Sequence, residues 1–344
     1  MIHKKILADL PMVYAVAVIQ VAGKPFYMAA SEAKDGKCYL IDAETYETHL
    51  IWDSPGGVMN LVPIEEEKGS FLAIEKFFPV FSSEQAFISR GELEIVNGTL
   101  TCTKEKICDL PFVHRIGLIG AGARKTLVAS TLCGGKAYTE DWSIPGGVYV
   151  GVYHPFSQIL LSQVQDGLIK NHGMFIKKEG GRDVVLFCSH EGVFQLKQND
   201  GQWQVEKFLN DECSDVFLED IDEDGVDELM TIQGFHGDQL VIYKRLEGVY
   251  RLVESIPIAF GHVLWAGKLC GHIGIIVGNR GGEKELNIYW RTSEIGQKVE
   301  FEKQTVDKDI GPAQIVVRHH RHGDDILSAN HGIGQLTLYQ LWMD

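Results

Sequence analysis

Apolar residues occur along this chain in short runs of about 5 to 8 residues, separated by Gly, Asp, Asn and Lys. Residues 115–119, 183–188 and 239–243 are examples, and they are rich in Val, Ile, Leu and Tyr. Few stretches show the 3.6-residue period of an amphipathic helix. Short strands at regular intervals, with turn residues between them, predict an all-β protein: a sandwich, a barrel or a propeller.

A repeated unit decides among these architectures. Each unit contains a first strand, a tight turn, a second strand, a short polar motif and a third strand. Seven units begin roughly 43 to 58 residues apart, a spacing typical of four-stranded propeller blades. Their starts lie near Tyr14, Asn60, His114, His172, Asp215, His262 and Ala313.

The two ends of the chain complement each other. Residues 9–14 resemble residues 109–114, which follow the outer strand expected at 100–107, whereas the last unit ends with its third strand at 335–342. We therefore predict that residues 2–10 form the outer strand of the last blade and remove its exposed edge. The predicted fold is a single all-β domain over residues 1–344, a seven-bladed β-propeller with four-stranded blades closed by the N-terminal strand.

Composition excludes several kinds of partner. The net charge is −15 and the pI is near 5.3, which argues against nucleic acid and anionic membranes, since both attract Lys and Arg. The chain contains no apolar run near the 20 residues of a membrane span and no leader-like N-terminus. We expect a cytoplasmic monomer or dimer, or a mature form without its leader. The seven scattered cysteines, without CxxC, predict buried thiols.

An acidic loop at residues 220–229 has the spacing of a calcium site. Its sequence, DIDEDGVDEL, places side-chain oxygens at the first, third, fifth and ninth positions and glycine at the sixth. Ca²⁺ prefers six to eight oxygen ligands from a tightly turned loop. Threonine at the twelfth position rules out an EF-hand, and a metal-free acidic turn is the alternative. The predicted ligands are Asp220, Asp222, Asp224, the Val226 carbonyl and Glu228.

At these residues the chain resembles the FG-GAP/VCBS family of propeller repeats. Blades of that family carry a DxDxDGxxD calcium loop between their first two strands. Glu228 stands where the pattern has its last aspartate, which keeps the carboxylate, and the match covers one blade. The resemblance implies a structural Ca²⁺ in this loop and a role in adhesion or recognition.

Six histidines and one arginine share the same phase of the repeat. In a propeller, the start of the first strand and the end of the second strand lie at the same rim of the central channel. We therefore expect these side chains to meet in one funnel. The residues are His114, His172 and His262 at strand starts, and His190, His236, Arg280 and His331 after second strands.

Three interpretations of this constellation stay open. The histidines cap turns, or they bind a divalent metal such as Zn, Mn, Fe or Ni, or with Arg280 they bind an anionic or sugar ligand without metal. For the metal interpretation we assign the roles by position. The expected ligands are His114, His172, His262 and His331, and the expected catalytic residues are His190, His236 and Arg280.

A metal in the funnel indicates a lyase, dehydratase or isomerase. The metal acts as a Lewis acid on a sugar or keto-sugar, a free histidine removes a proton, and Arg280 holds a carboxylate. In architecture and histidine content the chain is similar to the propeller domain of aldos-2-ulose dehydratases, and more distantly to the oligogalacturonate lyases. The alternative is a non-catalytic propeller that binds a carbohydrate or a protein.

Overall fold

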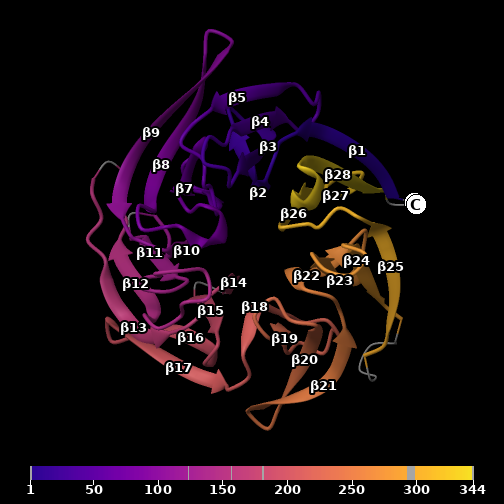
Figure 1. The fold of residues 1–344 in the computed structure, drawn as a ribbon. Helices are drawn as coiled ribbons and strands as arrows, with labels where there is room; N and C mark the ends of the chain where they lie inside the picture. The colour runs from indigo at the N-terminus through magenta and orange to yellow at the C-terminus, as the bar shows by residue number, and fades with distance from the viewer. Residues whose placement is uncertain (1, 123, 156, 180–181, 293–298, 343–344) are drawn as a thin grey trace.

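The chain folds into a ring of antiparallel sheets around a central axis (Figure 1). The structure, a computed structural model, describes residues 2–122, 124–155, 157–179, 182–292 and 299–342. These residues form seven four-stranded sheets, and in six of them the strands follow one another in sequence order. The predicted seven-bladed β-propeller is confirmed.

The first three blades come from residues 13–168. The first blade contains β2 (Val13–Val21), β3 (Lys24–Ser31), β4 (Cys38–Asp42) and β5 (Thr48–Trp52). The second contains β6 (Leu61–Pro63), β7 (Ser70–Glu75), β8 (Phe87–Val96) and β9 (Thr99–Asp109), with the 3₁₀ turn η1 (Pro79–Phe81) between β7 and β8. The third contains β10 (Val113–Ile119), β11 (Thr126–Thr131), β12 (Gly146–Val152) and β13 (Ser162–Leu168).

Three more blades continue this order. The fourth contains β14 (Gly173–Glu179), β15 (Arg182–Ser189), β16 (Gly192–Asn199) and β17 (Gln202–Leu209). The fifth contains β18 (Cys213–Glu219), β19 (Glu228–Gln233), β20 (Gln239–Leu246) and β21 (Val249–Pro257). The sixth contains β22 (Gly261–Leu269), β23 (His272–Asn279), β24 (Leu286–Arg291) and β25 (Phe301–Asp307). In the described residues, no helix is long and apolar enough to cross a membrane.

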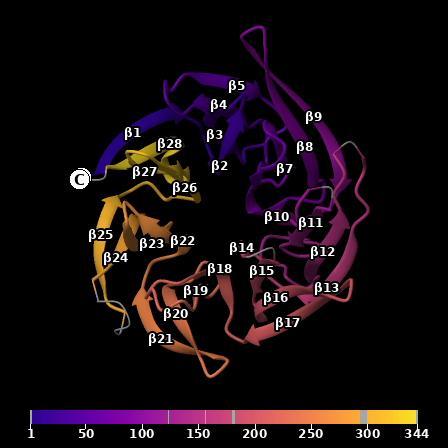
Figure 2. The same ribbon diagram turned by 180° about the vertical axis from the view of Figure 1, so that it is seen from behind.

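The seventh blade joins the two ends of the chain. It contains β26 (Gln314–His320), β27 (Gly323–Asn330), β28 (Gln335–Trp342) and, as its outer strand, β1 (Ile2–Asp9), with the 3₁₀ turn η2 (His331–Ile333) between β27 and β28. β1 pairs antiparallel with β28 from Ile2 opposite Leu341 to Asp9 opposite Gln335. Both faces of the ring show β1 alongside β28 at the circumference (Figures 1 and 2). The predicted closure is confirmed.

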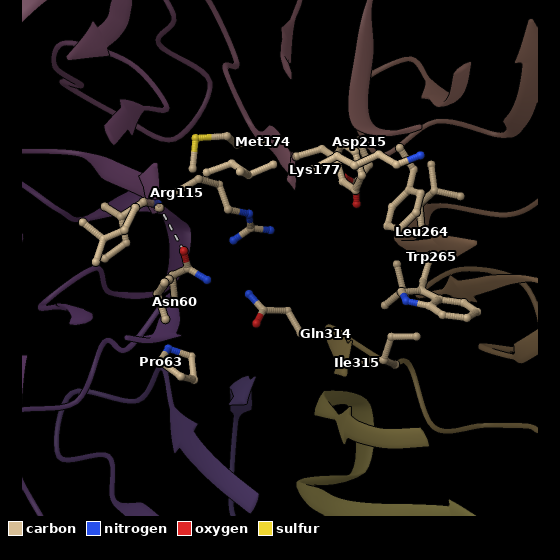
Figure 3. A pocket seen from close by; sticks show the side chains of 18 of the residues that line it. Asn60, Pro63, Arg115, Met174, Lys177, Asp215, Leu264, Trp265, Gln314 and Ile315 are labelled. Atoms are coloured by element: carbon tan, nitrogen blue, oxygen red, sulfur yellow. Dashed lines mark hydrogen bonds between the residues drawn. The ribbon is translucent and has the colours of Figure 1, made fainter. Parts of the chain in front are cut away.

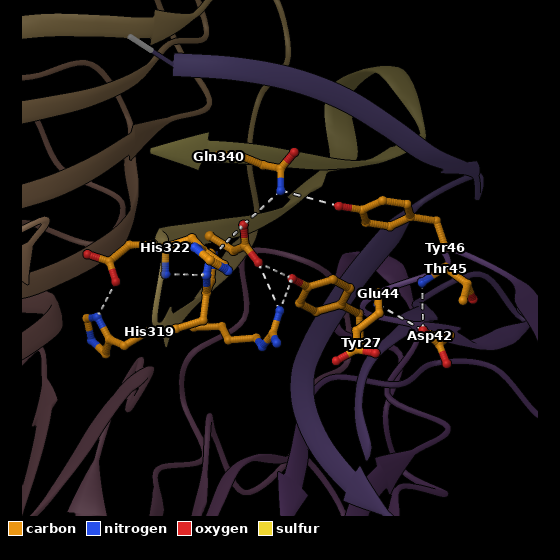
Figure 4. A network of polar contacts seen from close by, with 12 residues as sticks. Tyr27, Asp42, Glu44, Thr45, Tyr46, His319, His322 and Gln340 are labelled. Atoms are coloured by element: carbon orange, nitrogen blue, oxygen red, sulfur yellow. Dashed lines mark hydrogen bonds and ion pairs between the residues drawn. The ribbon is translucent and has the colours of Figure 1, made fainter. Parts of the chain in front are cut away.

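A polar network crosses the seam between the last and first blades (Figure 4). The Tyr27 hydroxyl on β3 donates to the buried Asp325 carboxylate on β27, which also accepts from Arg318 at 3.1 Å. The Gln340 amide donates to the second Asp325 oxygen at 3.2 Å and lies 3.3 Å from the Tyr46 hydroxyl. These hydrogen bonds fix the register of one blade against the other.

The hydrophobic core lies between blades rather than inside one blade. Each apolar cluster joins two successive sheets; Phe26 and Leu40 of the first blade, for example, pack with Phe71 of the second. Both faces of the inner strands are therefore buried, and β7 and β27 are buried at every residue. Continuous burial explains the apolar run in β7, whereas the outer strand β9 alternates over most of its length. β27 is equally buried but carries Asp324 and Asp325, which accept hydrogen bonds from the Cys270 N–H and the Tyr27 hydroxyl of the two neighbouring blades.

The seven cysteines, all within the described residues, are free thiols. Burial raises the pKa of Cys38 and Cys188 well above the usual range, so these thiols stay protonated. Five of the seven are buried as expected, whereas Cys102 and Cys270 are partly exposed.

The N-terminal strand is predicted to be essential for stability because it pairs with β28 and covers the seam. Deleting residues 2–9 removes these contacts and exposes the edge of β28. We expect a fall in Tm of at least about 10 °C in thermal unfolding followed by circular dichroism. The matched control is a circular permutant that begins at residue 10 and carries residues 2–9 after β28 through a short linker. The closure account is wrong if the deletion melts at the wild-type temperature or the permutant melts with the deletion.

Candidate functional site

A β-bulge near the start of the innermost strand directs side chains towards one end of the channel. The pairing register shifts across Tyr14 in β2, across His114 in β10, across Ser214 in β18 and across His262 in β22. A bulge inserts one unpaired residue and re-aims its side chain. Tyr14, His114 and His262 consequently line the same cavity, which we call the funnel, together with His172 immediately before β14.

Each of three funnel histidines is held by the next blade. The Nδ1 atom of His114 donates to the His172 carbonyl at 3.0 Å, that of His172 to the Ser214 carbonyl at 2.8 Å, and that of His262 to the Ala313 carbonyl at 2.8 Å. A carbonyl oxygen only accepts, so Nδ1 must carry the proton. The neutral ring then presents the lone pair of Nε2, the arrangement found in metal-binding histidines.

The Nε2 atoms of two histidines nearly touch. His236 Nε2 lies 3.2 Å from His172 Nε2, and potential ligand atoms of His172, His236 and His262 all lie within 4.8 Å of one another. The Tyr14 hydroxyl lies 3.4 Å from His262 Nε2. The fold thus brings side chains from four different blades within a few ångströms of one another.

The turn after β19 places His236. His236 has a φ of 51°, and a Cβ at the next residue, Gly237, would lie 1.5 Å from the Gln233 carbonyl oxygen. Only glycine fits there, so the turn folds back sharply. The His236 ring then packs between Phe235 and Phe260, with centroid separations of 4.2 and 4.8 Å.

Burial keeps the funnel histidines neutral. It lowers the pKa of His114, His172 and His262 well below the usual value, and that of His236 to about 3. The charge of Arg280 lowers the pKa of His236 further. Neutral imidazoles are the form that binds metals.

A second polar group, formed by His331, Glu32 and Arg280, lines the same funnel. His331 Nε2 lies 2.6 Å from the Glu32 carboxylate, and Arg280 Nη2 lies 3.0 Å from His331 Nδ1. A carboxylate accepts and a guanidinium donates, so His331 donates through Nε2 and accepts through Nδ1. Glu32 is 8 % exposed, which makes this a largely desolvated pair.

The remaining wall of the funnel is apolar and largely aromatic. The cavity has a volume of about 630 Å³, which suits a small-molecule ligand. Phe81 packs against Trp142 and Phe235 with ring centroids 5.6 and 6.4 Å apart. Other apolar lining residues are Met12, Met59, Phe77 and Phe260.

The structure brings together most of the residues singled out from the sequence. His114, His172, His236, His262, His331 and Arg280 line the funnel. His190 lies outside this lining; its side chain is 53 % exposed and its Nδ1 is 3.3 Å from a Glu212 oxygen. Sequence reasoning missed Glu32 and the aromatic wall. Glu32 follows the second strand of its blade, so the phase that selected His331 could also have found it.

The acidic loop joins β18 and β19. Carboxylate oxygens of Asp220, Asp222 and Asp224 lie within 4.8 Å of one another. Asp220 accepts the backbone N–H groups of residues 224 and 225 at 3.1 and 2.9 Å, which closes the turn. Glu228 is fully buried, and its Oε2 accepts the Ile221 N–H at 3.0 Å. Among the residues that the structure describes, its Oε1 has no hydrogen-bond partner.

A lysine ammonium lies among these carboxylates. Lys244 on β20 contacts Asp222, lies 2.7 Å from Asp224 and lies 3.9 Å from Glu228 Oε1. Burial and the Asp222 charge raise the pKa of Glu228 to about 7. One ammonium therefore compensates the negative charge of the cluster only in part.

Comparisons with known proteins identify the fold. No protein-family model matches this chain, and no curated protein matches it. Among solved structures, it is similar to BBS1N in a complex with ARL6DN, at 12 % identity and a TM-score of 0.60, covering 98 % of this chain and 95 % of that chain. At this identity the likeness shows the fold alone.

The depressed histidine pKa values predict that stability decreases in acid. Below pH 6.5 the unfolded chain takes up protons that the folded funnel does not bind, so each buried histidine lowers stability as the pH falls. Carboxyls with raised pKa values act in the opposite direction; they are Asp215, Glu219 and Glu228. A single-site comparison therefore isolates the histidine contribution.

His114→Asn retains a donor at the position of Nδ1 but cannot titrate. Between pH 6.5 and 5, we expect the unfolding free energy of the metal-free wild type to fall more steeply than that of His114→Asn, by up to about 1.4 kcal/mol per pH unit. Urea unfolding across this pH range measures both slopes, with His49→Asn, at a partly exposed position, as the control. Equal slopes for wild type and His114→Asn would show that His114 is not held neutral.

Proposed function

We propose that this propeller is a metal-dependent lyase, dehydratase or isomerase whose funnel binds a divalent transition metal through His172, His236 and His262. The observation that carries the proposal is the convergence of their ring nitrogens, with the two closest 3.2 Å apart. In a tetrahedral site with metal–nitrogen bonds of 2.0–2.1 Å, two ligand nitrogens lie about 3.3 Å apart. The spacing thus fits two ligands of one Zn²⁺-like ion.

The hydrogen bonds made by the other ring nitrogen of two of these histidines support the same assignment. His172 and His262 donate through Nδ1 to the carbonyls of Ser214 and Ala313, which orients Nε2 towards the common point. Three histidine ligands leave the fourth position of a tetrahedral ion free for substrate. A bound metal supplies Lewis acidity to a carbonyl or hydroxyl oxygen placed there.

Arg280 is the group for an anionic part of the substrate. Its guanidinium lines the same cavity and has His331 Nδ1 as a partner, at 3.0 Å. A guanidinium binds a carboxylate with two parallel hydrogen bonds, stronger than one bond to a neutral imidazole. A substrate carboxylate is therefore expected to draw Arg280 away from His331.

That movement exposes a base. Once Arg280 turns to the substrate, His331 Nδ1 has a free lone pair, while Nε2 remains bound to Glu32 at 2.6 Å. The carboxylate orients the ring and stabilises the imidazolium formed after proton removal, as in other carboxylate–histidine pairs. The roles inferred from position alone are thereby exchanged: His236 joins the metal ligands and His331 becomes the base.

The lining favours a compact substrate with one anionic end. A sugar or keto-sugar acid can place its carboxylate on Arg280 and its ring against the Phe81 and Phe235 side chains, which line the funnel. Removal of the proton next to the carboxylate, followed by loss of the β-oxygen substituent, is a β-elimination. Return of the proton to a neighbouring carbon is an isomerisation.

A protein-binding propeller is the second candidate. Tyr138 and Ile144, in the loop between β11 and β12 that also carries Trp142, are 66 % and 51 % exposed. Apolar side chains exposed beside a cavity are typical of interaction surfaces. BBS1N, which is similar in fold, is in complex with ARL6DN in its crystal structure. A protein partner would contact the exposed loop that carries Tyr138 and Ile144, whereas a substrate would bind inside the funnel.

We further propose that the acidic loop binds Ca²⁺ in a structural role, as the FG-GAP/VCBS resemblance implies. The buried and unbonded Glu228 Oε1 supports this, since a cation supplies the missing partner. The expected ligands are Asp220, Asp222, Asp224, the Val226 carbonyl and Glu228. Ca²⁺ must displace Lys244, so the two cations compete.

The metal proposal predicts near-stoichiometric Zn, Mn, Fe or Ni in protein purified without chelators. His172→Asn together with His262→Asn keeps the Nδ1-type donors but removes both Nε2 ligands, so the metal is lost while the fold is retained. Plasma mass spectrometry measures the metal, with His49→Asn/His190→Asn as a double control outside the site. Unchanged metal content in the His172/His262 variant would contradict the proposal.

Activity distinguishes the enzyme from the binding module. Uronates and keto-sugars are incubated with metal-loaded protein, and unsaturated products are followed by ultraviolet absorbance. Arg280→Gln is expected to lower kcat/KM about 10²- to 10³-fold, because the substrate anion loses its partner. A metal-loaded protein inactive on all these substrates, but captured by a protein partner through Tyr138, would favour the second candidate.

The calcium proposal predicts that millimolar Ca²⁺ raises Tm by mass action. Lys244→Met removes the competing ammonium, so the same Ca²⁺ concentration is expected to raise Tm further, with at least about tenfold tighter binding. Lys268→Met is the matched control, because Lys268 pairs with Glu223 of the same loop at 2.8 Å, outside the carboxylate cluster. Calcium without effect on wild type and Lys244→Met would exclude the site.

A further inference from the structure

A second cavity lies further along the same innermost strands. Its volume is about 680 Å³, and its walls come from the first strands of six blades, β6, β10, β14, β18, β22 and β26, in the described residues. His262 lines both cavities, so the second cavity and the funnel are neighbours. Figure 3 shows polar side chains from several strands around an open centre.

Two opposite charges face this space without forming an ion pair. Arg115 follows the bulge of β10 and Asp215 follows the bulge of β18, and both point into the cavity (Figure 3). The Arg115 guanidinium donates to the His114 carbonyl at 3.4 Å and hydrogen-bonds with the Tyr14 hydroxyl. Asp215 accepts the Val216 N–H at 3.0 Å. Within the described residues, neither has an oppositely charged partner within 4.0 Å.

Holding charged side chains in a partly buried cavity without an ion-pair partner costs desolvation free energy. Burial raises the pKa of Asp215 to about 7, while the positive charge of Arg115 opposes this increase. The two side chains therefore interact electrostatically across the cavity. A buried charge is normally compensated by a partner. Here the missing partners correspond to one anionic and one cationic group placed between Arg115 and Asp215.

Glu65, Lys177 and Lys178 also line the cavity, but each forms an ion pair with another side chain. Neutral polar and apolar groups complete the wall. Asn60 uses its carbonyl oxygen to accept the Ile116 N–H at 3.1 Å, which leaves its amide hydrogens as donors. Gln314 donates its amide to the Met59 carbonyl at 2.9 Å, which leaves its carbonyl oxygen as an acceptor. The apolar part of the wall includes Met174, Leu264, Trp265 and Ile315.

We infer that this second cavity binds a free α-amino acid with an apolar side chain. Arg115 binds the carboxylate through its two-donor fork, and Asp215 pairs with the ammonium. The Asn60 amide adds a donor to the carboxylate and the Gln314 oxygen an acceptor for the ammonium. The side chain packs against Leu264 and Trp265. This site requires neither the metal nor the chemistry of the funnel.

Isothermal titration calorimetry on metal-free wild-type protein tests this inference with four probes of similar shape. L-leucine and L-methionine carry both charges, 4-methylpentanoate carries only the carboxylate, and 3-methylbutylamine carries only the ammonium. We expect measurable binding of both amino acids and at least about tenfold weaker binding of each single-charge probe. Equal binding of 4-methylpentanoate and L-leucine, or no heat from either amino acid up to 10 mM, would overturn the inference.

Isosteric variants locate the binding. Asp215→Asn is expected to weaken L-leucine at least about tenfold and to remove its advantage over 4-methylpentanoate. Arg115→Gln is expected to weaken both carboxylates, and Arg124→Gln, at an exposed arginine after β10, serves as the control. Near-ultraviolet circular dichroism checks that each variant is folded. L-leucine that binds both folded variants with wild-type affinity would also overturn the inference.

Discussion

The structure depends on one constraint: each blade buries both of its faces against neighbouring blades. The apolar clusters join successive sheets, so a blade without a neighbour on one side would expose an apolar face of its inner strands. An open ring would have two such faces. Packing of the seventh blade against the first buries these faces, as where Tyr27 meets Leu327 and Leu338. Pairing of β1 with β28 covers the edge of the last sheet, and the Tyr27–Asp325 hydrogen bond links the two blades. Ring closure therefore fixes the position of every inner strand around the axis.

Closure also explains how a funnel can be built from residues that lie far apart in sequence. Bulges in the innermost strands turn Tyr14, His114 and His262 towards the axis, and carbonyls of the following blade hold His114, His172 and His262. The contacts between neighbouring blades, which stabilise the propeller, thus also set the tautomer of these imidazoles. The residue after the bulge faces the second cavity instead, as Arg115 and Asp215 do, which separates two sites along one axis.

Much of the fold could be predicted from the sequence because blade packing repeats. The spacing of the repeat predicted the starts of the seven units. The likeness between residues 9–14 and 109–114 predicted that the N-terminal strand closes the ring. The phase of the repeat also brought His172, His236 and His262 to one rim. A residue's position within the repeat, however, does not predict how far the loop that carries it extends towards the central axis. His190 lies in a two-residue turn between β15 and β16, too short to reach the axis, whereas five residues between β19 and β20 carry His236 inwards.

Individual roles within the site could not be predicted, because they depend on hydrogen-bond partners rather than on residue type. His331 and His236 share one phase, yet only His331 contacts a carboxylate, Glu32, from a blade adjacent in the ring but distant in sequence. Likewise, the spacing of the acidic loop indicates Ca²⁺, but Lys244 comes from another strand. These pairings follow from three-dimensional register.

The most direct test of the account is an anomalous diffraction experiment on crystals grown with Zn²⁺. Data collected on both sides of the zinc absorption edge locate the ion independently of any model of the site. The account predicts one strong peak in the funnel, about 2.0–2.1 Å from Nε2 of His172, His236 and His262. A funnel without a peak, or a peak bound elsewhere while these three rings keep their positions, would contradict it.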